Sequence, residues 1–323
     1  MIAIDLDGTL LGAEGRVSAR NLAAIKAATA AGVEVVIATG RRHSYAMRVL
    51  RALDLADANI LVSSNGTVTR SIGAALIDRT LLPSETTLWL CRHLDEFRNA
   101  MVITYDMVQP HGDDAYGALI VEELEELHGS IGKWMEANAA YIEQSLPIEA
   151  AISRRAATGE APIQMMLCGT IERMRRAEAR LLEDTRVFSA GVTPLERLAS
   201  AEIALSRTEY LERDLSLLDM LPASCSKGVA LLRLAASRGI DASGIMAIGD
   251  NWNDMSMLEI AGRAVLMENA PEDLKELAMT KGWLIGGHHL RDGVGDAIET
   301  VLRLQQSDPA EVEEERLVSG RRW

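Results

Sequence analysis

The first third of the chain alternates short hydrophobic runs with a segment of helical periodicity. Apolar runs at 2–5 and 33–38 flank a helix that the pattern predicts from about Ser18 to Ala31. Ser18 is a good N-cap for this helix, and Gly32 supplies a left-handed stop after it. This order of elements predicts a β-α-β unit.

The same alternation continues along the chain and returns near its end. A second helix is expected after Gly40, and an apolar run at 60–64 follows it. Continuous β-branched runs of this kind are typical of a parallel sheet with helices on both faces. We therefore expect an α/β fold with a doubly wound, mostly parallel, Rossmann-like core sheet. The later helices and strands are predicted at 226–239, 245–249, 254–261 and 264–267.

The middle of the chain has a different pattern, which indicates an inserted α+β domain. The expected core domain comprises 1–81 and 220–303, and the insert comprises 82–219. Residues 304–323 are charged and poor in apolar periodicity, so we expect a flexible tail there. Within the insert, helices are predicted at 84–98, 116–142 and 171–184, and strands at 101–106, 163–168, 186–190 and 201–207.

Composition and charge limit the classes of partner. A chain of 323 residues suits two domains. Its formal net charge of −14 argues against nucleic acid or an anionic membrane surface as partner, because both require a basic face. No apolar segment reaches the roughly 20 residues that span a bilayer, and a secretion signal is not evident, so a cytoplasmic protein is expected. Cys91, Cys168 and Cys225 are too far apart to indicate a zinc site or a disulfide framework.

Polar clusters follow four of the predicted strands. Each cluster taken alone is typical of an ordinary turn. In an open α/β sheet, however, the carboxyl ends of the strands lie together and form the usual ligand site. The four clusters are Asp5 with Asp7, Thr39 to Arg41, Ser63 to Gly66, and Gly249 and Asp250 with Asn253 and Asp254.

The acidic members of these clusters indicate a metal site. Asp5, Asp7 and Asp250 would repel one another unless a cation lay between them. Oxygen ligands with room for water and phosphate favour Mg²⁺ over zinc. A calcium loop of the EF-hand type starting at Asp5 is excluded, because Leu10 and Arg16 occupy the positions that require Gly and Glu.

The order of these motifs resembles the haloacid dehalogenase (HAD) superfamily, and specifically its Cof-type phosphatases with a large α+β cap of subclass IIB. The resemblance spans about 1–303, with the insert as the cap. The first motif, DLDGTLL, and the last, GDNWNDMSML, are highly specific to the family, whereas TGR and SKG support the resemblance only by their position and order. The motifs are DLDGTLL, TGR, SSNG, SKG and GDNWNDMSML.

The resemblance implies a role for each matching residue. Asp5 would be the nucleophile that forms an aspartyl-phosphate, and Asp7 the general acid and then the general base. Thr39 would hydrogen-bond the phosphoryl group, and Lys227 would supply a fixed positive charge. Mg²⁺ would be held by Asp5, the backbone carbonyl of Asp7, and Asp250.

The remaining site residues are assigned softer roles. Asp254 would orient Lys227 or a water at the metal. Gly40, Arg41, Asn65 and Asn253 are predicted to lie on the substrate side of the pocket, although a solvated arginine is an equally good interpretation of Arg41.

The expected function is Mg²⁺-dependent hydrolysis of phosphate monoesters of small metabolites, such as sugar phosphates. A phosphomutase-like phosphotransferase is the alternative, and a noncatalytic metabolite-binding protein is a weaker one. His111, Asp113 and Asp114, in a polar segment of the cap at 109–117, are candidates for contact with the substrate, but an exposed loop is the favoured interpretation.

Overall fold

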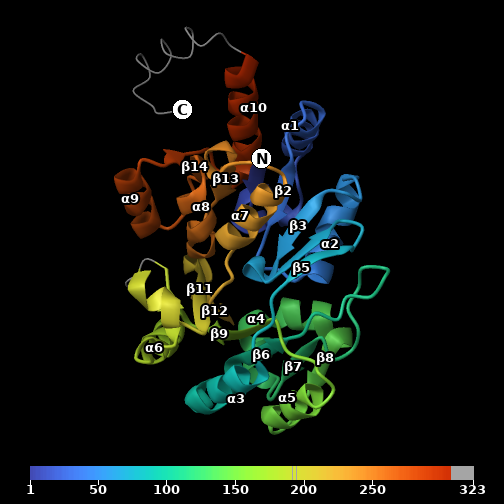
Figure 1. Ribbon diagram of the computed structural model, residues 1–323, viewed down its shortest axis with the longest axis vertical. Helices are drawn as coiled ribbons and strands as arrows, with labels where there is room; N and C mark the ends of the chain where they lie inside the picture. The colour runs from blue at the N-terminus through green and yellow to red at the C-terminus, as the bar shows by residue number, and fades with distance from the viewer. Residues whose placement is uncertain (191, 194, 307–323) are drawn as a thin grey trace.

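The computed structural model describes residues 1–190, 192–193 and 195–306, and its strands form two sheets (Figure 1). The first, the core sheet, contains β1 (Ile2–Ile4), β2 (Val35–Ala38), β3 (Ile60–Ser63), β4 (Val68–Ser71), β5 (Leu76–Arg79), β13 (Met246–Gly249), β14 (Arg263–Leu266) and β15 (Leu284–Ile285). Its order is β15-β14-β13-β1-β2-β3-β4-β5. All neighbours are parallel except along β3-β4-β5, so the predicted doubly wound, mostly parallel sheet is confirmed.

Helices cover both faces of the core sheet. α1 (Ala19–Ala30), α2 (His43–Leu50) and α10 (Gly293–Gln306) pack on one face, and α7 (Lys227–Ser237), α8 (Met255–Ile260) and α9 (Glu272–Lys281) on the other. Successive strand residues alternate between these layers: Ile4 is buried with the first set of helices and Ala3 with the second. Strands with two buried faces read as continuous apolar runs, which is why the sequence predicted them well.

Local signals fix the helix starts that matter for the site. The Ser18 side chain accepts a hydrogen bond from the Asn21 N–H, and Gly32 has φ of 79°, as predicted for the two ends of α1. Ser226 caps α7 in the same way, so this helix begins at Lys227. The cap therefore fixes where the Lys227 side chain leaves the backbone.

The second, or cap, sheet contains β6 (Met101–Thr104), β7 (Leu119–Val121), β8 (Ile142–Gln144), β9 (Gln164–Gly169), β10 (Val187–Ser189), β11 (Ile203–Tyr210) and β12 (Leu215–Pro222). Its order is β10-β11-β12-β9-β6-β7-β8. α3 (Ser84–His93), α5 (Ile148–Ala156) and α6 (Ile171–Leu182) pack on one face, and α4 (Glu125–Asn138) packs on the other. This arrangement confirms the expected α+β character of the insert.

Two predicted helices of the cap differ from the structure. The helix expected at 116–142 is wrong in its first part, because 119–121 is strand β7 and the helix begins only at Glu125. A short apolar run that is buried on a sheet cannot be told from a buried helix by periodicity. The helix expected at 84–98 ends at His93 and is followed by a tighter helical turn, Asp95–Ala100.

The domain boundaries stay a prediction that the two sheets favour. Strand β12 runs through Pro222, three residues past the predicted boundary at 219, and pairs with cap strands along its length. Helix α10 continues to Gln306, so residues 304–306 are helical, and the rest of the predicted tail, 307–323, lies outside the described residues. In Figure 1 the core occupies the upper half and the cap the lower half.

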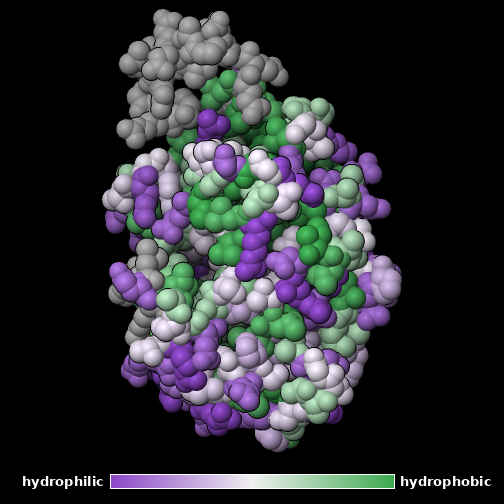
Figure 2. Space-filling view, viewed as in Figure 1, coloured by the Kyte–Doolittle hydropathy of each residue, from purple (hydrophilic) through white to green (hydrophobic). Residues whose placement is uncertain are grey.

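None of the helices in the described part of the chain is long and apolar enough to cross a membrane. The face drawn in Figure 2 intersperses hydrophilic and hydrophobic residues.

Candidate active site

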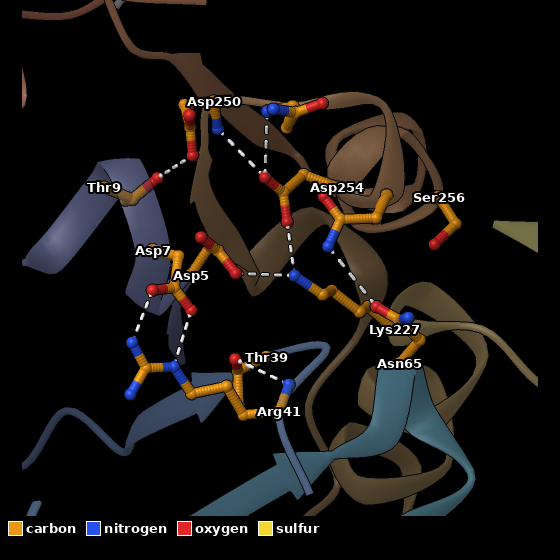
Figure 3. Close-up of polar contacts among 12 residues, drawn as sticks. Asp5, Asp7, Thr9, Thr39, Arg41, Asn65, Lys227, Asp250, Asp254 and Ser256 are labelled. Carbon is orange, nitrogen blue, oxygen red and sulfur yellow. Dashed lines mark hydrogen bonds and ion pairs between the residues drawn. The ribbon is translucent and has the colours of Figure 1, made fainter. Parts of the chain in front are cut away.

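The turn that follows β1 brings Asp5 and Asp250 close together. After Asp5 the chain makes a tight turn, Leu6–Leu10, in which Gly8 has φ of 77°. A Cβ atom at Gly8 would lie 2.3 Å from Oδ2 of Asp250, so only glycine permits this approach. The Thr9 hydroxyl donates to Asp250 Oδ1 over 2.8 Å (Figure 3). The turn therefore joins the ends of β1 and β13.

Lys227 lies between two carboxylates in the interior of the core. Its Nζ is 2.6 Å from Asp5 Oδ1 and 2.6 Å from Asp254 Oδ1, and its side chain is fully buried (Figure 3). Burial alone would lower the pKa of Lys227, but the charges of Asp254 and Asp5 outweigh it and raise the pKa above its ordinary value. Lys227 thus carries a fixed positive charge beside Asp5.

Asp254 uses both carboxylate oxygens to hold its neighbours. Oδ1 accepts from Lys227, and Oδ2 accepts the backbone N–H groups of Asp250 and Asn251 over 2.9 and 3.1 Å. The loop after β13 is therefore tied to the start of α7. These contacts suit the positioning role that the sequence assigned to Asp254.

The acidic residues fit a hard divalent cation. Carboxylate oxygens of Asp5, Asp250 and Asp254 lie within 4.8 Å of one another, and all three residues are buried. Burial, with a smaller contribution from Asp254, raises the pKa of Asp5 to about 7, and burial also raises the pKa of Asp250 well above its usual value. In the part of the chain that the structure describes, the ammonium group of Lys227 is the one that pairs with these carboxylates, so the cluster has excess negative charge. Because the Asp254 oxygens are already engaged, Asp5 and Asp250 are the better candidates for ligands.

Asp7 faces Arg41 across the site. Arg41 donates from Nε to Asp7 Oδ2 over 2.7 Å and from Nη2 to Oδ1 over 2.5 Å, an arrangement that fixes the carboxylate plane. The Thr39 hydroxyl oxygen accepts the Arg41 N–H over 3.1 Å. Asp5, Asp7, Thr39 and Arg41 all line one cavity, together with Gly40. The ion pair with Asp7 shows that Arg41 is not a solvated surface residue.

Asn65 and Asn253 connect the core to the cap. Asn253 Nδ2 donates to Asn65 Oδ1 over 3.3 Å, and Asn65 Nδ2 donates to Asp219 Oδ2 over 2.9 Å. Asp219 belongs to cap strand β12 and is buried. Asn253 lines the cavity. Asn65 does not line it, but it hydrogen-bonds to Asn253 and Asp219, which do.

Sequence reasoning missed several polar residues of the site, among them Asn269, Tyr210 and Asp219. Asn269 Nδ2 donates to the Gly8 carbonyl over 2.8 Å and so supports the turn after Asp5. Asn269 lies in the segment MENA, and the position of this segment directly after core strand β14 is the signal that could have indicated it. Tyr210 and Asp219 line the cavity from the cap and have no local motif. Burial, then the charge of Asp7, raises the pKa of Tyr210 above its ordinary value.

The segment at 109–117 is only in part the exposed loop that was expected: His111 and Tyr116 are exposed, but Asp114 is not. Asp114 is buried and accepts hydrogen bonds from Arg42 Nε and the Ser44 hydroxyl, both at the start of α2. Asp113 is more exposed and forms an ion pair with Arg51 over 3.0 Å. This part of the cap is therefore clasped to the core beside the cavity.

The cavity lies between core and cap and has a volume of about 350 Å³. Its core side carries Asp5, Asp7 and Arg41, and its cap side includes Trp134 and Tyr210. Pockets of this size hold small organic ligands rather than a phosphate ion alone. The cavity can therefore take a phosphate group at Asp5 and the attached organic group under the cap.

Comparison with known proteins agrees with this geometry. A family model described as haloacid dehalogenase-like hydrolase matches residues 2–298. The chain is 32% identical over 281 residues to the 5-amino-6-(5-phospho-D-ribitylamino)uracil phosphatase YwtE of Bacillus subtilis (strain 168), covering 85% of this chain and 90% of that protein. It is 26% identical over 276 residues to the HMP-PP phosphatase of Escherichia coli O8 (strain IAI1), covering 85% and 86%.

A solved structure shares the fold. The HAD subclass IIB sugar phosphatase BT4131 superposes with a TM-score of 0.66 at 21% sequence identity, over 93% of this chain and 98% of that one. The resemblance to capped Cof-type phosphatases, drawn from five motifs, is confirmed over nearly the whole described chain. The chain belongs to the haloacid dehalogenase-like hydrolase family.

Proposed function

We propose that this phosphatase hydrolyses phosphate monoesters of small metabolites through an aspartyl-phosphate on Asp5, with Mg²⁺ as its cofactor. The observation that carries the proposal is the Asp5 carboxylate, which lines the cavity while its Oδ1 is held by buried Lys227 over 2.6 Å. The second oxygen of Asp5 is then the one available for attack on phosphorus. The YwtE and HMP-PP phosphatase relatives support hydrolysis of small phosphorylated metabolites.

The first step forms one bond to phosphorus and breaks another. An Asp5 oxygen bonds to phosphorus as the ester P–O bond breaks, and Asp7 gives its proton to the departing alkoxide oxygen. Arg41 holds the Asp7 carboxylate at the cavity with two hydrogen bonds, one to each oxygen. Asp7 gives up one of these hydrogen bonds when that oxygen carries the proton.

The second step releases inorganic phosphate. Asp7, now ionised, takes a proton from a water molecule that attacks phosphorus, and the bond between Asp5 and phosphorus breaks. Lys227 supplies positive charge beside the reacting oxygens, and the Thr39 hydroxyl donates to a phosphoryl oxygen. The cap excludes bulk solvent during both steps.

Asp5, Asp250 and the Asp7 carbonyl are the proposed Mg²⁺ ligands, with Asp254 as a positioning residue behind them. When bound, Mg²⁺ would offset the repulsion between the Asp5 carboxylate and an anionic substrate. The excess negative charge of the buried cluster supports this assignment.

A combined labelling and chelation experiment tests the proposal. We expect an acid-quenched reaction with ³²P-labelled substrate to place the label on Asp5, as read by peptide mapping. Excess chelator should abolish phosphate release, Mg²⁺ should restore it, and zinc should substitute poorly. Label on another residue, or full activity in chelator, would overturn the assignment.

We also propose a cytoplasmic location and no nucleic-acid or membrane partner. Cys91, Cys168 and Cys225 are free, buried thiols, which suit a reducing compartment. Retention of the protein in the cytosolic fraction after cell disruption and osmotic shock is the expected result.

A further inference from the structure

The cap meets the loop after β13 through Asn251, a core residue that follows Asp250 and is buried. Its Oδ1 accepts the backbone N–H of Glu209 over 3.2 Å, and its Nδ2 donates to the Glu209 carbonyl over 3.0 Å. Glu209 belongs to cap strand β11, so one amide side chain pairs with both backbone groups of this strand residue. The loop that carries Asp250 therefore also holds the cap, a contact that the proposed mechanism does not use.

The end of β11 is held by two arginines of the cap as well. Arg175 of α6 donates to both carboxylate oxygens of Glu209, over 3.2 Å each. The Arg207 guanidinium lies over the ring of Trp252 in the core loop, 5.3 Å from the ring centroid. Tyr210, the last residue of β11, is therefore placed by contacts on the cap side and on the core side.

Tyr210 brings a hydrogen-bond donor to the cavity that Asp5 and Asp7 line. In the part of the chain that the structure describes, its hydroxyl group has no hydrogen-bond partner. Burial, followed by the charges of Asp7, Asp250 and Asp5, raises the pKa of this hydroxyl, so it keeps its proton at neutral pH. A protonated phenol donates a hydrogen bond without adding a charge to the site.

Resting on the proposed function, we propose that Tyr210 is a further catalytic residue and that Asn251 is the positioning residue that seats it. The Tyr210 hydroxyl donates to a nonbridging oxygen of the phosphoryl group at Asp5, and no bond to Tyr210 forms or breaks. These oxygens carry the charge of the transferring group, which a donor fixed in advance stabilises. Because Tyr210 comes from the cap, this donor is in place only while β11 is docked on the core loop.

The first test removes only the hydroxyl group. Tyr210→Phe keeps the ring, and we expect kcat of the Mg²⁺-loaded protein to fall by about 10-fold to 100-fold, since loss of one preorganised donor is costly. We measure p-nitrophenyl phosphate and phenyl phosphate, which differ in the quality of the leaving group. A donor to a nonbridging oxygen serves both esters, so the two losses should agree to within about threefold. The control is Tyr116→Phe, which changes a cap tyrosine that is 65% exposed and should leave kcat unchanged.

The second test separates the seating of β11 from the structure of the core loop. Asn251 Oδ1 also accepts the Trp252 N–H over 2.9 Å and so caps a short helical turn. In Asn251→Ser the hydroxyl can still cap this turn, but it is too short to reach both backbone groups of Glu209. We expect this change to lower kcat by about fivefold or more in the wild-type background and by less than about twofold in the Tyr210→Phe background, because one residue acts through the other.

Each outcome bears on one part of the inference. A kcat of Tyr210→Phe equal to that of the wild-type protein would overturn the catalytic role of Tyr210. A loss confined to phenyl phosphate would place the hydroxyl at the leaving oxygen and overturn the contact with a nonbridging oxygen. If Asn251→Ser lowers kcat by the same factor in both backgrounds, it does not act through Tyr210, and its positioning role is wrong.

Failure of the proposed function gives a different result. A wild-type protein that hydrolyses neither ester with Mg²⁺, or an Asp5→Asn variant that hydrolyses both well, would remove the chemistry at Asp5 itself. Loss of turnover in Asp5→Asn together with full turnover in Tyr210→Phe would overturn this inference alone.

Discussion

The core and cap walls of the cavity are built in opposite ways. The core wall is a network of charges in which Asp5, Lys227 and Asp254 are buried and paired over 2.6 Å. The cap wall mixes apolar side chains with polar ones, and among the described residues Gln164 Oε1 has no hydrogen-bond partner there. A wall that is already satisfied suits a chemistry common to many substrates, whereas an unmatched acceptor suits discrimination among them.

The contrast also separates positioning from selection. Core groups are fixed before a substrate arrives, because they hydrogen-bond to one another within and between the loop after β13, the turn after β1 and the start of α7. Such preorganisation lowers the cost of stabilising charge in the transition state. Substitutions in the core should therefore change the rate for every ester, and substitutions in the cap, Tyr210 apart, should change the rates for some esters only.

The largest effect, a loss of kcat, is expected for the substitution Asp5→Asn in the core. The amide keeps the shape of the side chain but removes the nucleophilic oxygen, so kcat should fall by about 10⁴-fold or more for all esters. Phosphate release measured with several substrates checks this, and no phosphoenzyme should form. Good turnover by this variant would remove Asp5 from the mechanism.

Asp7→Asn should behave differently from Asp5→Asn, although the two residues are only two positions apart. It leaves Asp5 able to attack but removes the acid and base, a role worth roughly 10²–10⁴-fold. A good leaving group such as p-nitrophenolate should partly rescue the first step. Labelled phosphoenzyme should accumulate in this variant, and its absence would contradict the assigned role.

Lys227→Met tests how strongly the core network depends on its one ammonium group. The change leaves Asp5 and Asp254 buried without their cation, and breaking a buried pair in this way lowers the free energy of unfolding by about 3–5 kcal/mol. The control is Lys281→Met, which removes a half-exposed pair with Glu259 at 3.0 Å and should cost at most about 1 kcal/mol. Urea denaturation of both variants in chelator gives the comparison, and equal losses would contradict the argument.

A smaller effect is expected where the cap is clasped to the core. Asp114→Asn removes the charge that Arg42 binds at a buried position, so the closed cap should be less stable. We expect KM to rise by about tenfold with a smaller change in kcat. Asp113→Asn, in which the affected pair with Arg51 is partly exposed, is the control and should change KM by less than about twofold. Steady-state kinetics decides, and equal effects would exclude a special role for Asp114.

The same contrast explains what could be predicted from the sequence. Ser226 and Lys227, or Asp5 and Gly8, are sequence neighbours whose residue types reveal a helix cap or a strand-end turn. The partners of cap residues are remote: Asp219 meets Asn65, 154 positions away, and Asp114 meets Arg42, 72 positions away. Local propensity and periodicity carry no information about such partners. The polar segment around Asp114 therefore looked like an exposed loop.

The smallest expected effect concerns Asp219, on the cap wall, and the pH dependence of stability. Burial raises the pKa of Asp219 to about 7, whereas the ordinary value near 3.8 applies to the unfolded chain. Between these values the folded protein binds the proton more tightly, so the contribution of Asp219 lowers stability as pH rises from about 4 to about 7. The Asp219→Asn variant has no carboxyl group at this position, so its stability does not fall with rising pH for this reason. Its melting temperature relative to wild type should therefore increase between about pH 5 and pH 8, by at least about 2 °C.

Differential scanning calorimetry of the two proteins at both pH values measures this change, and other titrating groups cancel in the difference. Asp95→Asn serves as the control, because its exposed side chain should give the same offset at both pH values. An offset for Asp219→Asn that stays constant would mean that Asp219 is ionised in the folded protein throughout this range. Asp219 would then resemble the carboxylates of the core wall, with a charge already stabilised before any ligand binds, and the contrast between the two walls would be lost.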